Sequence, residues 1–124
     1  MNRVVPVCAL VLAIGVSAAL AEEEAPKDLR SFYQRNCVQC HGANGSAHDT
    51  NGKRMRGQDF TDGHWLKITK DAAMVKIILG GKFFGLAMPA FKNQLSQEEA
   101  QRLVTEIIRP ATQGKAIEGA GKRE

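Results

Sequence analysis

The stretch "NCVQCHG", residues 36–42, places two cysteines two residues apart and a histidine directly after the second. Two thiols and an imidazole this close together have three common uses in proteins: a structural metal site, a redox dithiol and a covalently attached haem. The motif alone fits all three uses. The choice between them, and with it the fold, depends on what the rest of the chain supplies.

The first 21 residues, MNRVVPVCALVLAIGVSAALA, differ in composition from the rest of the chain. Arg3 is their only charged residue, an uncharged apolar run follows it, and the segment ends in Ala19-Leu20-Ala21 before an acidic stretch. A basic start, an apolar middle and small residues before the break indicate a secretory signal peptide, residues 1–21. We expect cleavage after Ala21 and a periplasmic protein without a membrane span. An uncleaved run would be just long enough to anchor the chain in a membrane.

The cysteine count argues against two of the three uses. Cys8 lies in the leading segment, so the rest of the chain has only Cys37 and Cys40. A structural zinc site needs four nitrogen or sulfur ligands, and His48 or His64 would have to complete it. A thioredoxin-like dithiol expects a strand–helix–strand context, and no alternating strand pattern is present. An exported chain would also tolerate a plain disulfide.

Two segments in the first part of the chain have the apolar periodicity of helices. The first runs from about Pro26 to Cys37, with Asp28 in its first turn, where the helix dipole favours a carboxylate. The second follows Thr69, a candidate N-cap, and ends at Gly80-Gly81, where glycine can adopt positive φ.

A third helix has the clearest boundary signals. Ser96 and Glu99 have the spacing of a capping box, and Arg109-Pro110 closes the apolar stripe that follows. These helices predict an all-α domain over residues 22–109. The remaining stretch, residues 110–124, holds three glycines and little apolar bulk, and we expect a flexible tail there.

Three short helices with long irregular connections bury too little apolar surface for a stable core, so a large apolar cofactor at the centre is favoured. C-x-x-C-H is the attachment motif of c-type haem, in which two thiols add to two vinyl groups and the next imidazole reaches iron. The sequence therefore predicts one covalent haem c on Cys37 and Cys40, with His41 as the proximal iron ligand.

Met88 is the favoured second iron ligand. It stands in "FGLAMPAF", where Pro89 pushes the preceding residue towards extended backbone, so that Met88 projects from a stiff loop. A thioether suits haem iron, and nearby phenylalanines would keep water away. The alternative is that Met88 binds no iron and only fills the loop as a buried apolar side chain, a hydrophobic plug. The phenylalanines are Phe83, Phe84 and Phe91, and the other candidate ligands are Met55, Met74, His48 and His64.

Cys37-Val38-Gln39-Cys40-His41, followed some 47 residues later by Met88-Pro89 and then by a capped helix, resembles a class I monohaem cytochrome c over about residues 26–109. The resemblance implies three main helices plus short helical turns packed around one covalent haem, with the N- and C-terminal helices crossing beside it. Trp65 is similar to the family's tryptophan near a haem propionate, and ordinary core filling explains it equally well.

The chain departs from the family's pattern in two ways. Leu29 stands where the family often has a glycine at the helix crossing, and Glu106 or Ile107 stands where it often has an aromatic residue. The crossing is therefore expected to be looser or differently packed. No proline lies between His41 and Met88, so a carbonyl other than the family's proline carbonyl has to accept the histidine's second N–H.

Histidine and methionine together close the iron, so the resemblance implies one-electron transfer in a respiratory chain and no enzymatic activity. The expected partners are redox proteins. Residues 53–92 hold 8 basic and 3 acidic residues, which fits an acidic docking face on the partner, or only a solvated surface. The net charge of +4 is too small to imply nucleic acid. The alternatives are a haem subunit of a larger dehydrogenase or reductase, and an open-site enzyme or sensor if Met88 does not ligate.

Overall fold

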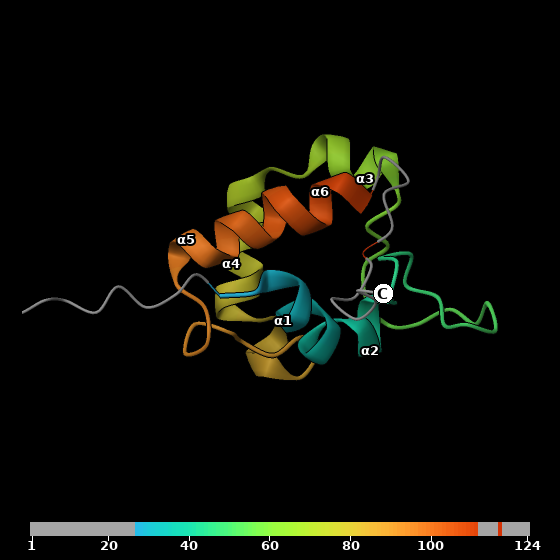
Figure 1. The fold of residues 1–124 in the computed structure, drawn as a ribbon, viewed down its shortest axis with the longest axis horizontal. Coiled ribbons are helices and arrows are strands. Elements are labelled where there is room, and N and C mark those ends of the chain that lie inside the picture. Colours follow the sequence, from blue (N-terminus) through green and yellow to red (C-terminus); the bar gives the residue numbers. More distant parts are fainter. Residues whose placement is uncertain (1–26, 112–116, 118–124) are drawn as a thin grey trace, which may run out of the picture.

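The computed structural model describes residues 27–111 and residue 117, and in this part of the chain it contains helices and no strands (Figure 1). The expected signal peptide, residues 1–21, lies outside the described residues. None of the described helices is long and apolar enough to cross a membrane. The predicted all-α architecture is confirmed in the described residues. The elements are α1 (Leu29–Asn36), α2 (Val38–His41), α3 (Gly63–Ile68), α4 (Asp71–Gly80), the 3-10 turn η1 (Phe83–Gly85), α5 (Gln97–Arg102), the π-helical η2 (Leu103–Ile108) and α6 (Arg109–Ala111).

Helix α1 begins later than the sequence suggested. Asp28 is its N-cap, and the carboxylate accepts hydrogen bonds from the backbone N–H groups of Arg30 and Ser31. The prediction of a start near Pro26 with Asp28 inside the first turn was therefore wrong. A carboxylate at the N-cap satisfies two of the N–H groups that the first turn leaves open, which explains the later start.

Helix α3 was missed, and its presence changes the role of Thr69. Asp62 caps α3 by accepting from the N–H groups of His64 and Trp65. Thr69 ends this helix, because its N–H donates to the Trp65 carbonyl, 3.0 Å away. The predicted N-cap role of Thr69 for α4 was wrong. That position belongs to Lys70, whose side chain makes no capping hydrogen bond.

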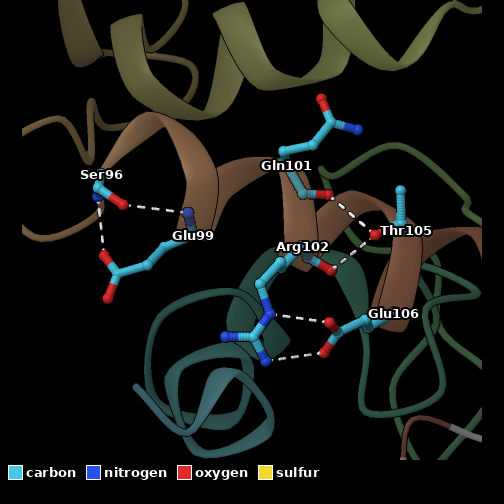
Figure 2. Close-up of polar contacts among 6 residues, drawn as sticks. All are labelled: Ser96, Glu99, Gln101, Arg102, Thr105 and Glu106. Carbon is cyan, nitrogen blue, oxygen red and sulfur yellow. Dashed lines mark hydrogen bonds and ion pairs between the residues drawn. The ribbon is translucent and has the colours of Figure 1, made fainter. Parts of the chain in front are cut away.

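The predicted capping box at the third main helix is confirmed. The Ser96 hydroxyl accepts from the Glu99 N–H at 3.1 Å, and the Glu99 carboxylate accepts from the Ser96 N–H at 2.8 Å (Figure 2). From this cap, α5, η2 and α6 follow one another as a single long rod, coloured orange in Figure 1.

The middle of this rod is a π-helix, a feature that apolar periodicity does not reveal. The Thr105 hydroxyl donates to the carbonyls of Gln101 at 3.2 Å and Arg102 at 3.4 Å (Figure 2). A wider turn displaces carbonyls from their usual partners, and a hydroxyl one turn further on can satisfy them.

The rod also continues past its predicted end. The Arg109 N–H bonds to the Val104 carbonyl, five residues earlier, and the helix runs through Pro110 to Ala111. A proline ring normally clashes with the carbonyl four residues before it, and the widened turn just upstream gives that carbonyl room. The proline therefore does not end the helix.

The rod packs against α1 and α4 and buries one continuous core. Leu29 and Ile107, which stand where the family often has glycine and aromatic residues, are both 4% exposed. Aliphatic side chains thus fill the contact where α1 crosses the rod. The core side chains with less than 2% exposure are Tyr33, Ala47, Val75, Ala100, Leu103 and Val104.

Arg109 fastens the rod to the junction of α3 and α4. Its guanidinium donates to the Asp71 carboxylate at 2.8 and 2.6 Å and to the Thr69 carbonyl at 2.6 Å, and it also bonds the Leu66 carbonyl. One side chain therefore holds three segments from two distant parts of the sequence.

Two described residues of the expected tail, 110–124, belong to the packed core. Ala111 is 2% exposed and Ile117 is 3% exposed. The Ile117 side chain lies beside Gly45, and the Gln34 amide donates to the Ile117 carbonyl at 3.2 Å. The remainder of the tail, 112–116 and 118–124, lies outside the described residues.

Candidate cofactor site

All five predicted site residues line one cavity of about 380 Å³. These are Cys37, Cys40 and His41 from the first part of the chain, Trp65 from α3, and Met88 from the loop after η1. Residues more than 50 positions apart in the sequence therefore converge on the same space.

The walls of this cavity are apolar in the centre and basic at the edge. No aspartate or glutamate is among the described residues that line it. Apolar walls with a few cations match a flat hydrophobic ring system that carries carboxylates. The apolar lining includes Phe60, Met74, Ile77, Ile78, Phe91 and Ile108, and the basic lining is Arg54, Arg56 and Lys82.

Helix α2 is a single turn that presents both thiols. The N–H groups of Cys40 and His41 bond to the Cys37 carbonyl at 3.1 and 2.9 Å. Both cysteines are free in the described part of the chain. Burial, with a smaller contribution from Cys40, raises the pKa of Cys37 to about 12, so this thiol is neutral in the folded apoprotein.

The His41 ring is held in one tautomer by a backbone carbonyl. Its Nδ1 lies 2.9 Å from the Gln58 carbonyl oxygen, which can only accept, so Nδ1 carries the proton and Nε2 keeps its lone pair. Burial is the main cause that lowers the pKa of His41, and Arg54 adds to it, against the opposing effect of the Gln58 contact. The neutral imidazole is the metal-binding form.

Gln58 is the carbonyl partner that the sequence left unidentified, and Gly57 makes the approach possible. The Gly57 N–H donates to the Cys40 carbonyl at 2.7 Å. A Cβ at residue 57 would overlap that carbonyl and would lie 2.7 Å from Nδ1 of His41. Only glycine therefore fits at residue 57, where the loop segment that carries Gln58 passes close to α2. In the sequence, only a single glycine between two polar residues marks this position, and such a pattern is too common in loops to indicate a contact with the histidine.

Phe60 fixes the plane of the His41 ring. The two rings stack with centroids 4.4 Å apart and planes 12° apart. Phe60 in turn lies 6.0 Å from the Trp65 ring, which is half-buried and packs against the core. The Gln58 carbonyl thus sets the position of the proton on His41, and Phe60 sets the orientation of its ring.

Met88 is half-buried and shares a small apolar pocket with His41, Cys37 and Phe91. Its carbonyl accepts from the Lys82 N–H at 2.9 Å, which closes the loop 82–88. Met88 and His41 therefore line the same small pocket, although they lie 47 positions apart in the sequence.

The phenylalanines expected to cover Met88 divide into two groups. Phe91 is 5% exposed, as expected, whereas Phe83 is 74% exposed and Phe84 is fully exposed. Phe83 and Phe84 have φ values of 49° and 54°, and this left-handed backbone turns them outward. The expectation that Phe84 shields Met88 was wrong, whereas Phe83, although mostly exposed, still lines the cavity that Met88 lines.

The other candidate ligands lie elsewhere or have other surroundings. Met74 is buried on α4 and lines the cavity, Met55 is half-buried, and His48 and His64 are exposed. Within the described ranges, no group of three or more His, Cys, Asp and Glu side chains is placed to hold a metal ion. The described residues thus contain no four-ligand cluster for the alternative zinc site.

Comparison with known proteins gives a consistent result. The family model described as cytochrome c oxidase, cbb3-type, subunit III matches residues 24–105. The solved structure of the KustC0563 c-type cytochrome is 29% identical, with a TM-score of 0.54, and the alignment covers 68% of this chain and 98% of that one. A point mutant of Kustc0563 is 28% identical, with a TM-score of 0.50, over 71% and 98% of the two chains.

A third solved structure, the c-type cytochrome XoxG from Methylobacterium extorquens AM1, is 22% identical, with a TM-score of 0.47, over 78% of this chain and 57% of that one. No curated protein matched the sequence. Fold, cavity and relatives define a monohaem c-type cytochrome, which carries a covalently bound haem c and works by haem-based electron transfer. The chain belongs to the family of cytochrome c oxidase, cbb3-type, subunit III.

Proposed function

We propose that this protein is a periplasmic one-electron carrier that shuttles electrons between redox proteins, with its haem c bound to Cys37 and Cys40 and its iron held by His41 and Met88. The observation that supports this most directly is the shared cavity, which His41 and Met88 line together with Cys37 and Cys40. The bound haem supplies reversible one-electron exchange at its iron.

The protein's own residues prepare this site. The Gln58 carbonyl keeps the proton on Nδ1 of His41, so that the Nε2 lone pair is available, and Phe60 holds the ring plane. Met88 supplies a soft sulfur ligand, which raises the reduction potential relative to nitrogen-only ligation. The apolar walls exclude water, and two protein ligands leave no open position for oxygen or peroxide.

The basic edge of the cavity is suited to the carboxylates of the cofactor. We assign Trp65 a contact with a haem propionate, together with Arg54 and Arg56, which line the same cavity. Arg54 is fixed by hydrogen bonds from its guanidinium to the carbonyls of Ala47 at 3.2 Å and Gly57 at 3.0 Å. A cation fixed in this way keeps its position whether or not the carboxylate is charged.

The redox partner is proposed to present an acidic face to the basic stretch 53–92. Opposite charges increase the rate of encounter, and salt screens them. Transfer rates measured by stopped flow should therefore fall as ionic strength rises. Rates independent of salt would remove this part of the proposal.

The axial ligands are tested by the oxidised visible spectrum. A sulfur-to-iron charge-transfer band should be present in the wild type and absent from Met88→Ala. Met74→Leu is the matched control, because Met74 is a buried methionine that lines the same cavity and it should keep the band. A band retained in Met88→Ala would show that another residue ligates the iron.

Covalent attachment is tested separately. Acid and organic solvent should leave the haem on the wild-type polypeptide, and Cys37→Ala together with Cys40→Ala should release it. Colour that washes off the wild type would contradict attachment through these thiols.

A second candidate function is a haem c subunit of a larger redox complex. The matched family is described as an oxidase subunit, and this chain shows exposed apolar side chains next to the cavity. Copurification from a native extract in defined stoichiometry with a larger enzyme would support it. A monomeric, freely exchanging holoprotein would support the carrier.

A further inference from the structure

Gly81, the residue directly after α4, has a backbone conformation that other residues rarely adopt. Its φ is 71° and its ψ is −174°, a combination found almost only in glycine. Its N–H still donates to the Ile77 carbonyl at 2.8 Å, so the residue is held to the last turn of the helix. The chain therefore leaves α4 in a way that needs glycine at residue 81.

The space around Gly81 is filled by the backbone that carries Met88. A Cβ at residue 81 would lie 2.6 Å from the Met88 carbonyl oxygen, 3.0 Å from the Ala90 nitrogen and 3.1 Å from the Pro89 carbonyl carbon. All three are backbone atoms, so no flexible side chain can move aside. A Cβ at the neighbouring Gly80 would meet no described atom within 4 Å. The close approach is thus specific to residue 81.

The segment that follows Met88 is fastened to the end of α4. The last carbonyls of a helix lack partners inside it, and here backbone N–H groups from outside the helix satisfy them. The hydrogen bonds run from the N–H groups of Phe91 and Lys92 to the carbonyls of Ile78 and Leu79, over 3.0 and 3.1 Å. On the other side, the Lys82 N–H donates to the Met88 carbonyl at 2.9 Å. Met88 is therefore held between two attachments to the same helix end.

The stiffness of this segment couples the Met88 carbonyl to the Met88 side chain. The peptide that joins residues 88 and 89 is planar, and Pro89 restricts the residue before it to extended backbone. The carbonyl therefore cannot turn away from a new neighbour without moving the Cα of Met88. A displacement at segment 88–90 would thus move the side chain that shares a small apolar pocket with His41.

We propose that Gly81 is a positioning residue for Met88. Because residue 81 has no side chain, the end of α4 holds the Met88 backbone closely, and this contact sets how readily another ligand displaces the thioether from the iron. The inference rests on the proposed ligation by Met88 and adds the residue that controls its firmness. Gly57 has the corresponding place beside His41, so close backbone approach at a glycine positions each of the two proposed ligands.

The first test titrates the oxidised holoproteins with imidazole, which binds the iron only by displacing the thioether. Gly81→Ala should lower the half-saturating imidazole concentration about tenfold, because more of the protein has an open iron. It should also weaken the sulfur-to-iron charge-transfer band. Gly80→Ala should match the wild type. Gly52→Ala adds a Cβ at a φ of 78° with no described atom within 4 Å, so it should lose stability in urea without binding imidazole more tightly.

A second measurement uses the wild type alone and does not depend on how well Gly81→Ala folds. Coupling between two events is reciprocal, so a ligand that displaces the thioether should also loosen the segment that holds it. Saturating imidazole should therefore speed hydrogen exchange of the Lys82 and Phe91 N–H groups about tenfold. The Glu99 N–H, which is bonded to Ser96 at the start of α5, is the internal control and should keep its exchange rate.

The outcomes separate the positioning role from the ligation on which it rests. Wild-type imidazole affinity in Gly81→Ala, an equal gain in Gly52→Ala, or unchanged exchange at Lys82 and Phe91 would each overturn the role of Gly81. Met88→Ala is the reference, since it should bind imidazole far more tightly than any of these variants. If Met88→Ala binds imidazole only as the wild type does, Met88 is not the ligand, and the proposed ligation fails together with this inference.

Discussion

The Gln58 carbonyl oxygen lies 2.9 Å from Nδ1 of His41, and Gly57 brings it there by bonding to the Cys40 carbonyl. The backbone that follows the Cys-x-x-Cys-His turn is thus tied both to an attachment residue and to the ring of the next residue. This contact replaces a proline carbonyl with the carbonyl of an ordinary polar residue. Its strength depends on close approach, and therefore on the absence of a side chain at residue 57.

Gly57→Ala should displace the Gln58 carbonyl, because its Cβ would lie 2.7 Å from Nδ1 of His41. We expect a loss of about 2 kcal/mol in the free energy of unfolding by urea, and a changed reduction potential, because the hydrogen bond of His41, the proposed iron ligand, is weakened. Gly63→Ala is the control, since a Cβ there meets nothing within 4 Å. Equal behaviour of the two variants would show that the contact is not needed.

Carbon monoxide should distinguish a closed iron from an open one. If Met88 ligates the iron as proposed, the reduced wild type should keep its absorption spectrum under carbon monoxide, because no open position is left at the iron. Met88→Ala should show a prompt shift, and Met74→Leu should behave as the wild type. A prompt shift in the wild type would instead favour the open-site enzyme or sensor.

Arg109→Leu should destabilise the protein by about 2 kcal/mol, measured by urea unfolding, because it leaves the part-buried Asp71 carboxylate and two carbonyls without this donor. Arg102→Leu removes an exposed ion pair with Glu106, one turn along the same rod, and it should have little effect. Figure 2 shows this control pair. If both changes have the same small effect, the Arg109 contacts do not hold the rod to α3 and α4.

Ile117→Ala should lower the free energy of unfolding by about 2 kcal/mol, because it removes a buried side chain from its contact with Gly45. Ile68→Ala removes the same atoms from a side chain that is 65% exposed and should be nearly neutral. The comparison is made by thermal and urea unfolding of the holoproteins. A neutral Ile117→Ala would mean that residue 117 contributes nothing to the fold.

Acid should weaken the cap of α5. The Ser96 N–H, and to a smaller extent Lys27, hold the pKa of Glu99 below its usual value of 4.5. A lowered folded pKa stabilises the protein above pH 4.5, and this contribution is lost as the pH falls through the folded value. Glu99→Gln keeps an acceptor without the charge, so its stability should depend less on pH below 4.5 than that of the wild type or of Glu98→Gln. Parallel pH profiles for all three would contradict this role.

The sequence singled out residues that the structure brings together, because their chemistry is carried by side chains. Cys37, Cys40 and His41 form a local motif, and Met88 was singled out by its proline neighbour; their roles towards the haem stay predictions. All of them line one cavity. The Ser96–Glu99 cap was equally readable, since both partners lie in one turn.

The features that escaped prediction depend on backbone or on distant partners. The Gln58 carbonyl has no side-chain signature, and its role follows only from the three-dimensional approach of Gly57. Thr69 has a good N-cap side chain, but α3 uses its backbone to end a helix. The outward turn of Phe83 and Phe84 depends on left-handed backbone, which aromatic residues seldom adopt.

The position of Ile117 has a consequence for the order in which the molecule can be completed. Its side chain and Phe60, the residue that stacks on the His41 ring, both lie beside Gly45. The packing around the loop that carries Gly45 is therefore completed by a residue made long after the Cys-x-x-Cys-His motif. A chain that ended before residue 117 would carry that motif and still lack the side chain that packs behind this loop.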